Sequence, residues 1–280
     1  MVKLSDVISA SFEILKESVS KPRMEAELLA AHVLKKDRIY ITVHKNDFLT
    51  LENAEEIYRI SRLRADGMPF AYITGKKEFM SLEFCVNSDV LIPRPETEEL
   101  VGLVIDLCKN RDVKILDLCT GSGAITISCA YYLPQSVCHG VDISDGAVQI
   151  AKLNASNLGL ENRVSFWKHD VLCPQWNRGL YDVVISNPPY IETKTVTELD
   201  KTVRSFEPHL ALDGGDDGLT FYKKIAETAG MYLKKGGIIL FEIGYNQGMA
   251  VAEIMKDKFK DIKVIKDYSG NDRIVYGVLC

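Results

Sequence analysis

The stretch Val113-Lys114-Ile115-Leu116-Asp117-Leu118-Cys119-Thr120-Gly121-Ser122-Gly123-Ala124 decides the fold of this chain. Its first six residues are mostly apolar and predict a buried strand, and the residues after Gly123 predict a helix. Glycines between a strand and a helix let the chain turn tightly and let a ligand approach the backbone. The third glycine of a dinucleotide-binding loop is absent, because position 126 is Thr. The stretch therefore predicts a ligand-binding loop within an α/β domain.

Strand and helix patterns alternate from residue 96 onward. This alternation predicts a mostly parallel, seven-stranded sheet with helices on both faces. We expect strands near residues 113–118, 137–142, 163–168, 181–186, 236–243, 262–267 and 273–279. We expect helices at residues 96–110, 123–133, 145–158, 218–234 and 247–259.

The chain before this region reads as a small helical domain over residues 1–75. Apolar residues recur at helical spacing from Leu4 to Leu15, Pro22 can open a second helix, and a third runs from about Leu51 to Leu63. The domain has no catalytic constellation of its own, and we favour substrate recognition over a purely structural role.

A short β-hairpin linker is predicted over residues 76–95, between the helical domain and a catalytic domain over residues 96–280. Residues 78–86 and 90–92 read as its two extended segments, and Asn87-Ser88-Asp89 reads as its turn.

Composition argues against several functional classes. The net charge is −5, which lacks the basic excess of proteins that bind nucleic acid strongly. No apolar run approaches the roughly 20 residues that span a membrane, and the first residues lack the apolar core of a signal peptide. Seven cysteines without a Cys-x-x-Cys pair indicate reduced thiols and no metal site. We expect a cytoplasmic monomer.

The second strand of the predicted sheet ends at Asp142. A carboxylate at that point of an α/β sheet can accept hydrogen bonds from ribose hydroxyls. A turn or helix-capping role is the alternative.

The tetrapeptide Asn187-Pro188-Pro189-Tyr190 follows the strand at 181–186, so it lies where open α/β sheets bind their ligands. The two prolines fix φ twice and remove two backbone donors. The Asn187 side chain and the Pro188 carbonyl can then act as adjacent acceptors, and Tyr190 can pack against a planar group. Two acceptors suit the planar NH2 of an amide or a nucleobase. A proline-rich turn is the alternative.

The loop Asp117-x-x-x-Gly121-x-Gly123, together with Asp142, resembles the Rossmann-like methyltransferases that use S-adenosyl-L-methionine (AdoMet). The resemblance implies that Thr120 to Gly123 approach the methionine part of AdoMet and that Asp142 holds its ribose. It also implies that Asp170 and Val171 lie by the adenine. The cofactor-binding set that follows from it is Asp117, Cys119, Thr120, Gly121, Ser122, Gly123, Asp142, Asp170, Val171 and Asn187.

Several longer strings narrow the resemblance to the PrmC/HemK family. They are Pro69-x-x-Tyr72-Ile73-Thr74-Gly75-x-x-Glu78-Phe79, Val90 to Glu98, Phe206 to Leu219, and Glu242-Ile243-Gly244. Members of that family methylate the side-chain amide (N5) of the glutamine in the Gly-Gly-Gln motif of class I peptide-chain release factors. The resemblance implies that Asn187, Pro188, Pro189 and Tyr190 hold this glutamine. It also implies that the helical domain grips the release factor.

Other interpretations stay open at this point. The substrate could instead be a glutamine of a ribosomal protein or an exocyclic amine of a nucleic-acid base, and the chain could be a binding module without activity. Glu96 and Thr97 either begin a helix or line the substrate pocket. Glu242 ends a core strand, where a charge suggests a nearby donor or a pocket role. Cys119 replaces a glycine of many family members and should affect binding little.

Overall fold

The computed structural model describes residues 1–173 and 175–280, which form two compact units. Unit 1 comprises Met1–Gly75 and Asp200–Phe206. Unit 2 comprises Lys76–Leu199 and Glu207–Cys280.

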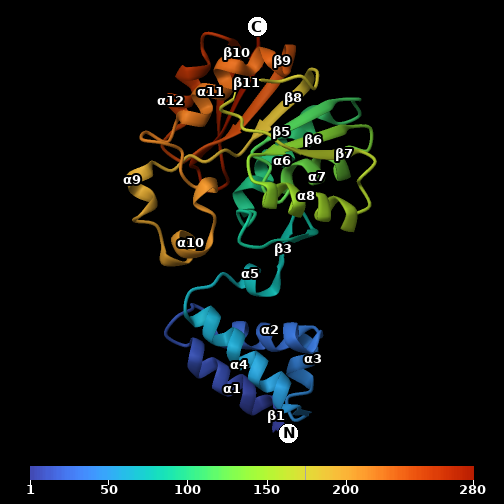
Figure 1. The fold of residues 1–280 in the computed structure, drawn as a ribbon, viewed down its shortest axis with the longest axis vertical. Coiled ribbons are helices and arrows are strands. Elements are labelled where there is room, and N and C mark those ends of the chain that lie inside the picture. Colours follow the sequence, from blue (N-terminus) through green and yellow to red (C-terminus); the bar gives the residue numbers. More distant parts are fainter. Residues whose placement is uncertain (174) are drawn as a thin grey trace. The chain divides into compact units, whose positions relative to one another are not determined.

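Unit 1 is built on the three helices that the apolar spacing predicts: α1 (Leu4–Leu15), α2 (Pro22–Leu34) and α4 (Leu51–Ala65) (Figure 1). Pro22 occupies the first turn of α2, where its missing N–H removes no helical hydrogen bond. The Thr50 hydroxyl caps α4 by accepting a hydrogen bond from the Asn53 N–H. The smaller elements of this unit are β1 (Val2–Lys3), β2 (Phe48–Leu49), α3 (Arg38–Val43), α5 (Phe70–Thr74) and α10 (Lys201–Phe206).

Helix α10 belongs to unit 1 although more than a hundred residues separate it from the rest of that unit along the chain. A Cβ atom built on Gly67 would lie 3.5 Å from the Phe206 ring and 3.7 Å from the Thr202 methyl group. No sequence pattern indicated this association.

Unit 2 contains the seven-stranded, mostly parallel sheet that the sequence predicts. The strand order is β10-β11-β9-β8-β5-β6-β7. Strands β7, β6, β5, β8 and β9 are parallel, and β11 pairs antiparallel with both β9 and β10. The strands are β5 (Lys114–Leu118), β6 (Val137–Asp142), β7 (Val164–Lys168), β8 (Tyr181–Ser186), β9 (Leu233–Glu242), β10 (Phe259–Lys266) and β11 (Asp272–Leu279).

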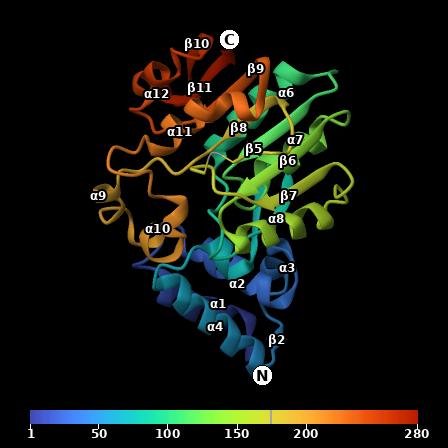
Figure 2. The same ribbon diagram turned by 45° about the horizontal axis from the view of Figure 1, so that its top comes forward.

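Helices cover both faces of this sheet (Figure 2). Consecutive buried strand residues divide between the two faces, since Val183 and Ile185 belong to one core cluster and Val184 belongs to the other. The first face packs against α6 (Pro95–Cys108), α7 (Ala124–Tyr132) and α8 (Asp145–Asn157). The second packs against α11 (Thr220–Thr228) and α12 (Gly248–Met255).

The predicted position of the hairpin turn is wrong. The hairpin consists of β3 (Lys76–Phe79) and β4 (Leu82–Cys85), and its turn is Met80-Ser81. Both turn residues have positive φ, at 51° and 58°, as a two-residue hairpin turn of type I′ requires. Met-Ser lacks the Asn-Gly signal of such turns, so the sequence did not reveal it. Residues 90–92 are not a strand.

Further boundaries differ from the sequence prediction. Helix α12 ends and strand β10 begins earlier than expected, at Met255 and Phe259 rather than at residues 259 and 262. Helix α11 ends at Thr228 rather than residue 234, and the 3-10 helix η2 (Ala229–Met231) follows it. Strand β9 begins at Leu233 rather than 236, because it continues through Gly236, where φ is positive and the pairing with β8 shifts register. Two short helices, α9 (Thr193–Val196) and η1 (His209–Ala211), were not predicted.

The packing beneath the glycine loop can be tested by a substitution at Gly140 of β6. A Cβ atom there would lie 2.6 Å from Thr120 Oγ1 and 2.7 Å from the Phe166 ring. We expect Gly140→Ala to lower the free energy of unfolding by about 1–3 kcal/mol through overpacking, as measured by urea denaturation.

The matched control is Gly102→Ala in α6, where no atom lies within 4 Å of the new Cβ. Alanine should there raise stability by about 0.5–1 kcal/mol. Equal effects of the two changes would contradict the packing described for Gly140.

Candidate active site

The candidate site lies at the carboxyl ends of the central parallel strands. In the register of the sheet Leu118 of β5 pairs with Ser186 of β8, and the Ser186 hydroxyl donates to the Leu118 carbonyl at 2.7 Å. Cys119 and Asn187 therefore leave the sheet at the same level. Strand β5 lies between β6 and β8, so the chain departs in opposite directions at this point, where α/β sheets bind ligands.

A cavity of about 410 Å³ opens beside these strand ends. This is within the roughly 300–1,000 Å³ typical of cofactor and small-molecule sites. Ten of the residues chosen from the sequence line it: Thr97, Cys119, Thr120, Gly121, Ser122, Asp142, Asp170, Val171, Asn187 and Pro189.

Five of the residues chosen from the sequence are not among the lining residues. Asp117 and Gly123 lie behind the glycine loop, Pro188 is buried, and Glu96 is exposed at the start of α6. The partly buried Tyr190 ring packs against the core on the second sheet face. Burial raises the pKa of Tyr190 to about 12.

Asp117 shapes the glycine loop from behind. It is fully buried, and its Oδ2 accepts hydrogen bonds from the hydroxyls of Thr120 (2.6 Å) and Thr126 (2.7 Å). Its Oδ1 has no hydrogen-bond partner among residues 1–173 and 175–280. Burial raises the pKa of Asp117 to about 7, although the two threonine hydroxyls act against the shift.

Asn154 of α8 joins the glycine loop to the hairpin. Its side chain donates to the Ser122 carbonyl at 2.9 Å and to the Cys85 carbonyl at 3.0 Å, and it accepts from the Cys85 N–H at 2.7 Å. All hydrogen-bonding groups of one buried amide are thus used to hold the loop.

Asp142 faces the cavity with both carboxylate oxygens already aligned by the backbone. Oδ2 accepts from the Gly121 N–H and Oδ1 from the Ser144 N–H, each at 2.9 Å. Burial raises the pKa of Asp142, and these backbone donors oppose the shift. A carboxylate with fixed orientation and remaining lone pairs fits a ligand that offers hydroxyl groups.

Cys119 adopts the left-handed conformation, with φ of 65°. That conformation favours glycine, so the thiol occupies a glycine-type position without changing the path of the loop. Burial raises the pKa of the Cys119 thiol well above its ordinary value, which keeps it protonated.

The loop after β8 is clamped by close backbone contacts. A Cβ on Gly214 would lie 2.8 Å from the Pro189 carbonyl oxygen, and one on Gly218 would lie 2.4 Å from the Tyr190 carbonyl oxygen. Gln247 donates to the Tyr190 carbonyl at 3.0 Å and to the Gly218 carbonyl at 3.2 Å. Glycines are required here because any side chain would displace the loop.

A buried ion pair joins two further segments of the cavity wall. Arg94 Nη2 lies 2.5 Å from Glu207 Oε1, and the Glu207 side chain is 2% exposed. Pro208, Leu210 and Ala211 follow Glu207 and line the cavity, as does Arg94. Arg94 and Glu207 both lie in strings that the sequence marked as particular, but neither residue was assigned a role. His169 also lines the cavity.

Among residues 1–173 and 175–280, no group of three or more His, Cys, Asp or Glu side chains is arranged to hold a metal ion. Nor does any helix in those ranges have the length and apolar character needed to cross a bilayer.

Two family descriptions match this chain. Residues 102–215 match the Methyltransferase small domain, and residues 6–75 match the PrmC N-terminal domain.

Curated relatives match over almost the whole chain. The release factor glutamine methyltransferase of Clostridium acetobutylicum is 38% identical over 281 residues, which cover 99% of each chain. The corresponding protein of Moorella thermoacetica is 41% identical, and the match covers 91% of this chain and 90% of that protein. The release factor glutamine methyltransferase of Bacillus subtilis is 39% identical, and the match covers 80% of this chain and 81% of that protein.

Solved structures of methyltransferases share the fold. The hMettl16 catalytic domain in complex with the MAT2A 3′UTR hairpin 6 has a TM-score of 0.57 at 16% identity, over 78% of this chain and 81% of its own. A methyltransferase from Pyrococcus furiosus has a TM-score of 0.53 at 16% identity, over 72% and 91%. The predicted methyltransferase fold is confirmed.

Asp117 gives the stability of the protein a distinctive dependence on pH. Its pKa is raised from 3.8 to about 7 in the folded state, so the folded chain holds one more proton than the unfolded chain between these values. The resulting stabilisation is complete below the unfolded pKa and is lost as pH rises through the folded pKa. As the pH rises from about 5 to about 6.5, loss of the Asp117 contribution should lower the free energy of unfolding by about 1.4 kcal/mol per pH unit.

We expect Asp117→Asn to remove this contribution, which urea denaturation across the pH range can measure. The control is Asp200→Asn, because hydrogen bonds from Thr202 lower the pKa of Asp200 instead. Identical slopes for the native chain and Asp117→Asn would show that Asp117 is not protonated in the fold.

Proposed function

Because this chain belongs to the release factor glutamine methyltransferases, we propose that it transfers a methyl group from AdoMet to the side-chain amide nitrogen of a release-factor glutamine. The family predicted from the sequence strings is confirmed. The glutamine is that of the Gly-Gly-Gln motif in class I release factors, whose modification supports translation termination.

The residues around the cavity fit AdoMet. Asp142 presents an oriented carboxylate for ribose hydroxyls, and Asp170, which accepts from the Leu172 N–H at 2.9 Å, can accept from the adenine amine. Gly121 leaves room for close approach of the loop, because nothing lies within 4 Å of its missing Cβ. The lining also carries Asp89, so acidic groups outnumber the cation Arg94 and suit a sulfonium.

AdoMet would supply an electrophilic methyl group: the new N–C bond would form as the S–C bond breaks, S-adenosyl-L-homocysteine would leave, and one amide proton would pass to water. The chain's own residues hold the nucleophile, which is a poor one because the lone pair of an amide nitrogen is delocalised. The Asn187 side-chain oxygen and the Pro188 carbonyl accept hydrogen bonds from the two N–H groups of the glutamine, which fixes it and favours localisation of the lone pair. Positioning of this kind contributes much of the rate in a displacement reaction.

The observation that carries this proposal is the common level of Asn187 and the glycine loop at the ends of paired strands. A nucleic-acid base could offer the same NH2 group, but the net charge of −5 argues against strong phosphate binding. A glutamine of a ribosomal protein is the second candidate substrate. That the enzyme acts as a monomer in the cytoplasm stays a prediction.

Labelled AdoMet tests the substrate directly. Incubation with a class I release factor should label one glutamine, and Gln→Ala in its Gly-Gly-Gln motif should abolish the labelling. Greater incorporation into RNA, DNA or ribosomal proteins than into the release factor would reject this substrate.

Asn187→Ala tests the role of the side-chain acceptor. We expect kcat to fall by at least about 100-fold, since the substrate amide loses an oriented partner, while AdoMet affinity by calorimetry changes by less than about threefold. Asn157→Ala, at an exposed asparagine of α8 outside the cavity, is the control and should retain activity. A parallel loss of kcat and AdoMet affinity would mean that Asn187 mainly shapes the cofactor pocket.

A further inference from the structure

Glu242 is a buried acid that the proposed chemistry does not use. It ends β9 directly after Phe241, which pairs with Ser186 of β8 in the sheet, so it lies beside the strand end that carries Asn187. Its exposed fraction is 1% and it does not line the cavity. Within the part of the chain that the structure describes, its Oε2 has no hydrogen-bond partner. Burying a carboxyl group in this way is costly, which suggests a specific role.

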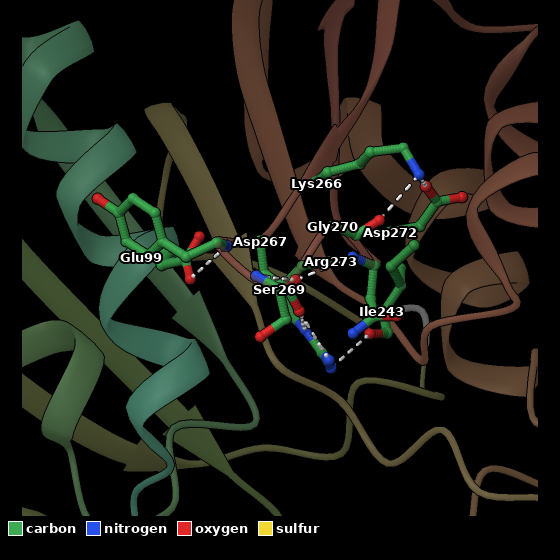
Figure 3. A network of polar contacts seen from close by, with 10 residues as sticks. Glu99, Ile243, Lys266, Asp267, Ser269, Gly270, Asp272 and Arg273 are labelled. Atoms are coloured by element: carbon green, nitrogen blue, oxygen red, sulfur yellow. Dashed lines mark hydrogen bonds and ion pairs between the residues drawn. The ribbon is translucent and has the colours of Figure 1, made fainter.

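The charged groups around Glu242 do not neutralise it. Arg273 of β11 reduces its pKa but forms its ion pair with Asp267, at 3.2 Å, and also donates to the Ile243 carbonyl (Figure 3). Glu96 of α6, a like charge, raises the pKa of Glu242. The remaining ionisable neighbours are the phenols of Tyr190 and Tyr222, both of which have raised pKa values partly because of Glu242.

Glu242 therefore titrates near neutrality. Burial raises its pKa to about 7, and hydrogen bonding from Thr97 and Asn187 counteracts the shift. Thr97 lies in the first turn of α6, and its exposed fraction is 4%. Because both Thr97 and Glu242 are buried, neither side chain can hydrogen-bond with bulk water.

Thr97 connects Glu242 to the proposed substrate clamp. Asn187 Nδ2 donates to Thr97 Oγ1 at 3.3 Å. A threonine hydroxyl has a single hydrogen, so while Thr97 donates that hydrogen to Glu242 it can only accept from Asn187. The NH2 end of the Asn187 amide then faces Thr97, and its oxygen end is left for the substrate.

We propose that Glu242 is a positioning residue: directly and through Thr97 it fixes the orientation of the Asn187 side-chain amide, so that the Asn187 oxygen faces the substrate. This inference rests on the proposed function. A flipped Asn187 would present its own NH2 to the NH2 of the glutamine, and two donors would then oppose each other. A group at position 242 that only accepts hydrogen bonds prevents this flip. Thr97 must donate its one hydrogen to that group and therefore cannot donate it to Asn187.

The proposal also explains why an acid is required. Glutamine at position 242 could donate to Thr97, and the freed hydroxyl hydrogen could then bond to the Asn187 oxygen. Protonation of Glu242 would have the same effect, so the orientation of Asn187 depends on the ionised form.

The first test compares kcat of the native enzyme and Glu242→Gln on a release factor. We expect Glu242→Gln to lower kcat by about 10- to 100-fold, as for misplacement of a reacting group, and to change AdoMet affinity by less than about threefold. Glu253→Gln, at a side chain that is 69% exposed on α12, should retain native kcat. An unchanged kcat in Glu242→Gln would overturn the proposal.

The pH profile of kcat separates positioning from a merely structural role. The native profile should rise through about pH 7 as Glu242 ionises, and the rise should be absent in Glu242→Gln. Asp117 has a similarly raised pKa, so Asp117→Asn is measured as well and should keep the rise. Persistence of the rise in Glu242→Gln, or its loss in Asp117→Asn alone, would contradict the assignment.

Two further comparisons keep the proposal testable if Glu242→Gln does not fold. Thr97→Ser retains the hydroxyl and should keep kcat within about threefold of native, whereas Thr97→Val should lose about as much kcat as Glu242→Gln is expected to lose. In an Asn187→Ala background, Thr97→Val should cause little additional loss, because the effect acts through Asn187. Additive losses, or equal activity of Thr97→Ser and Thr97→Val, would reject it.

These outcomes are distinguishable from failure of the proposed function. If the native enzyme binds AdoMet but labels no release factor, the substrate assignment fails. If it labels the factor while the Glu242 and Thr97 variants behave like Glu253→Gln, only the positioning role fails.

Discussion

Parallel pairing of β5, β8 and β9 is the constraint on which the rest of the active site depends. Leu118 pairs with Ser186, and Ser186 pairs with Phe241, so three successive strands end at one level. The glycine loop follows the end of β5, Asn187 follows the end of β8, and Glu242 is the last residue of β9. A shift of one residue in either pairing would turn alternate side chains to the opposite face of the sheet and separate the three groups. Hydrogen bonds of the backbone therefore set the geometry that the side chains use.

Two carboxyl groups lie at these strand ends without a counter-ion that balances them. Asp117 lies behind the cofactor loop and Glu242 behind the clamp, and each has one oxygen without a hydrogen-bond partner. In both cases hydroxyl groups, those of Thr120 and Thr126 or that of Thr97, stand between the acid and the groups that face the cavity. Buried acids that hydrogen-bond to hydroxyls behind the cavity wall orient the neighbouring polar groups and keep their negative charge out of the ligand site.

The sequence was sufficient to predict the sheet and to place Asp142 and Asn187 at the strand ends that border the cavity, because both depend on local patterns. Apolar runs located the strands, and Asp142 and Asn187 were found from their places after strand ends. The sequence could not show features that leave no local pattern. The turn at Met80-Ser81 has no sequence signal, and the ion pair between Arg94 and Glu207 joins residues more than a hundred positions apart. Asp117 and Gly123 were assigned to the ligand although they lie behind the loop, since a motif gives positions along the chain and not the side from which they act.

The membership of α10 in unit 1 has a consequence for the synthesis of the protein. The amino-terminal helices leave the ribosome first, yet the surface near Gly67 is covered by Thr202 and Phe206. Residues Lys76–Leu199, including four strands of the seven-stranded sheet, must therefore be made before unit 1 gains its last helix. Of the two units, the amino-terminal one begins to emerge first but is complete only after residues 200–206 are made, so its final consolidation is coupled to translation of the catalytic unit.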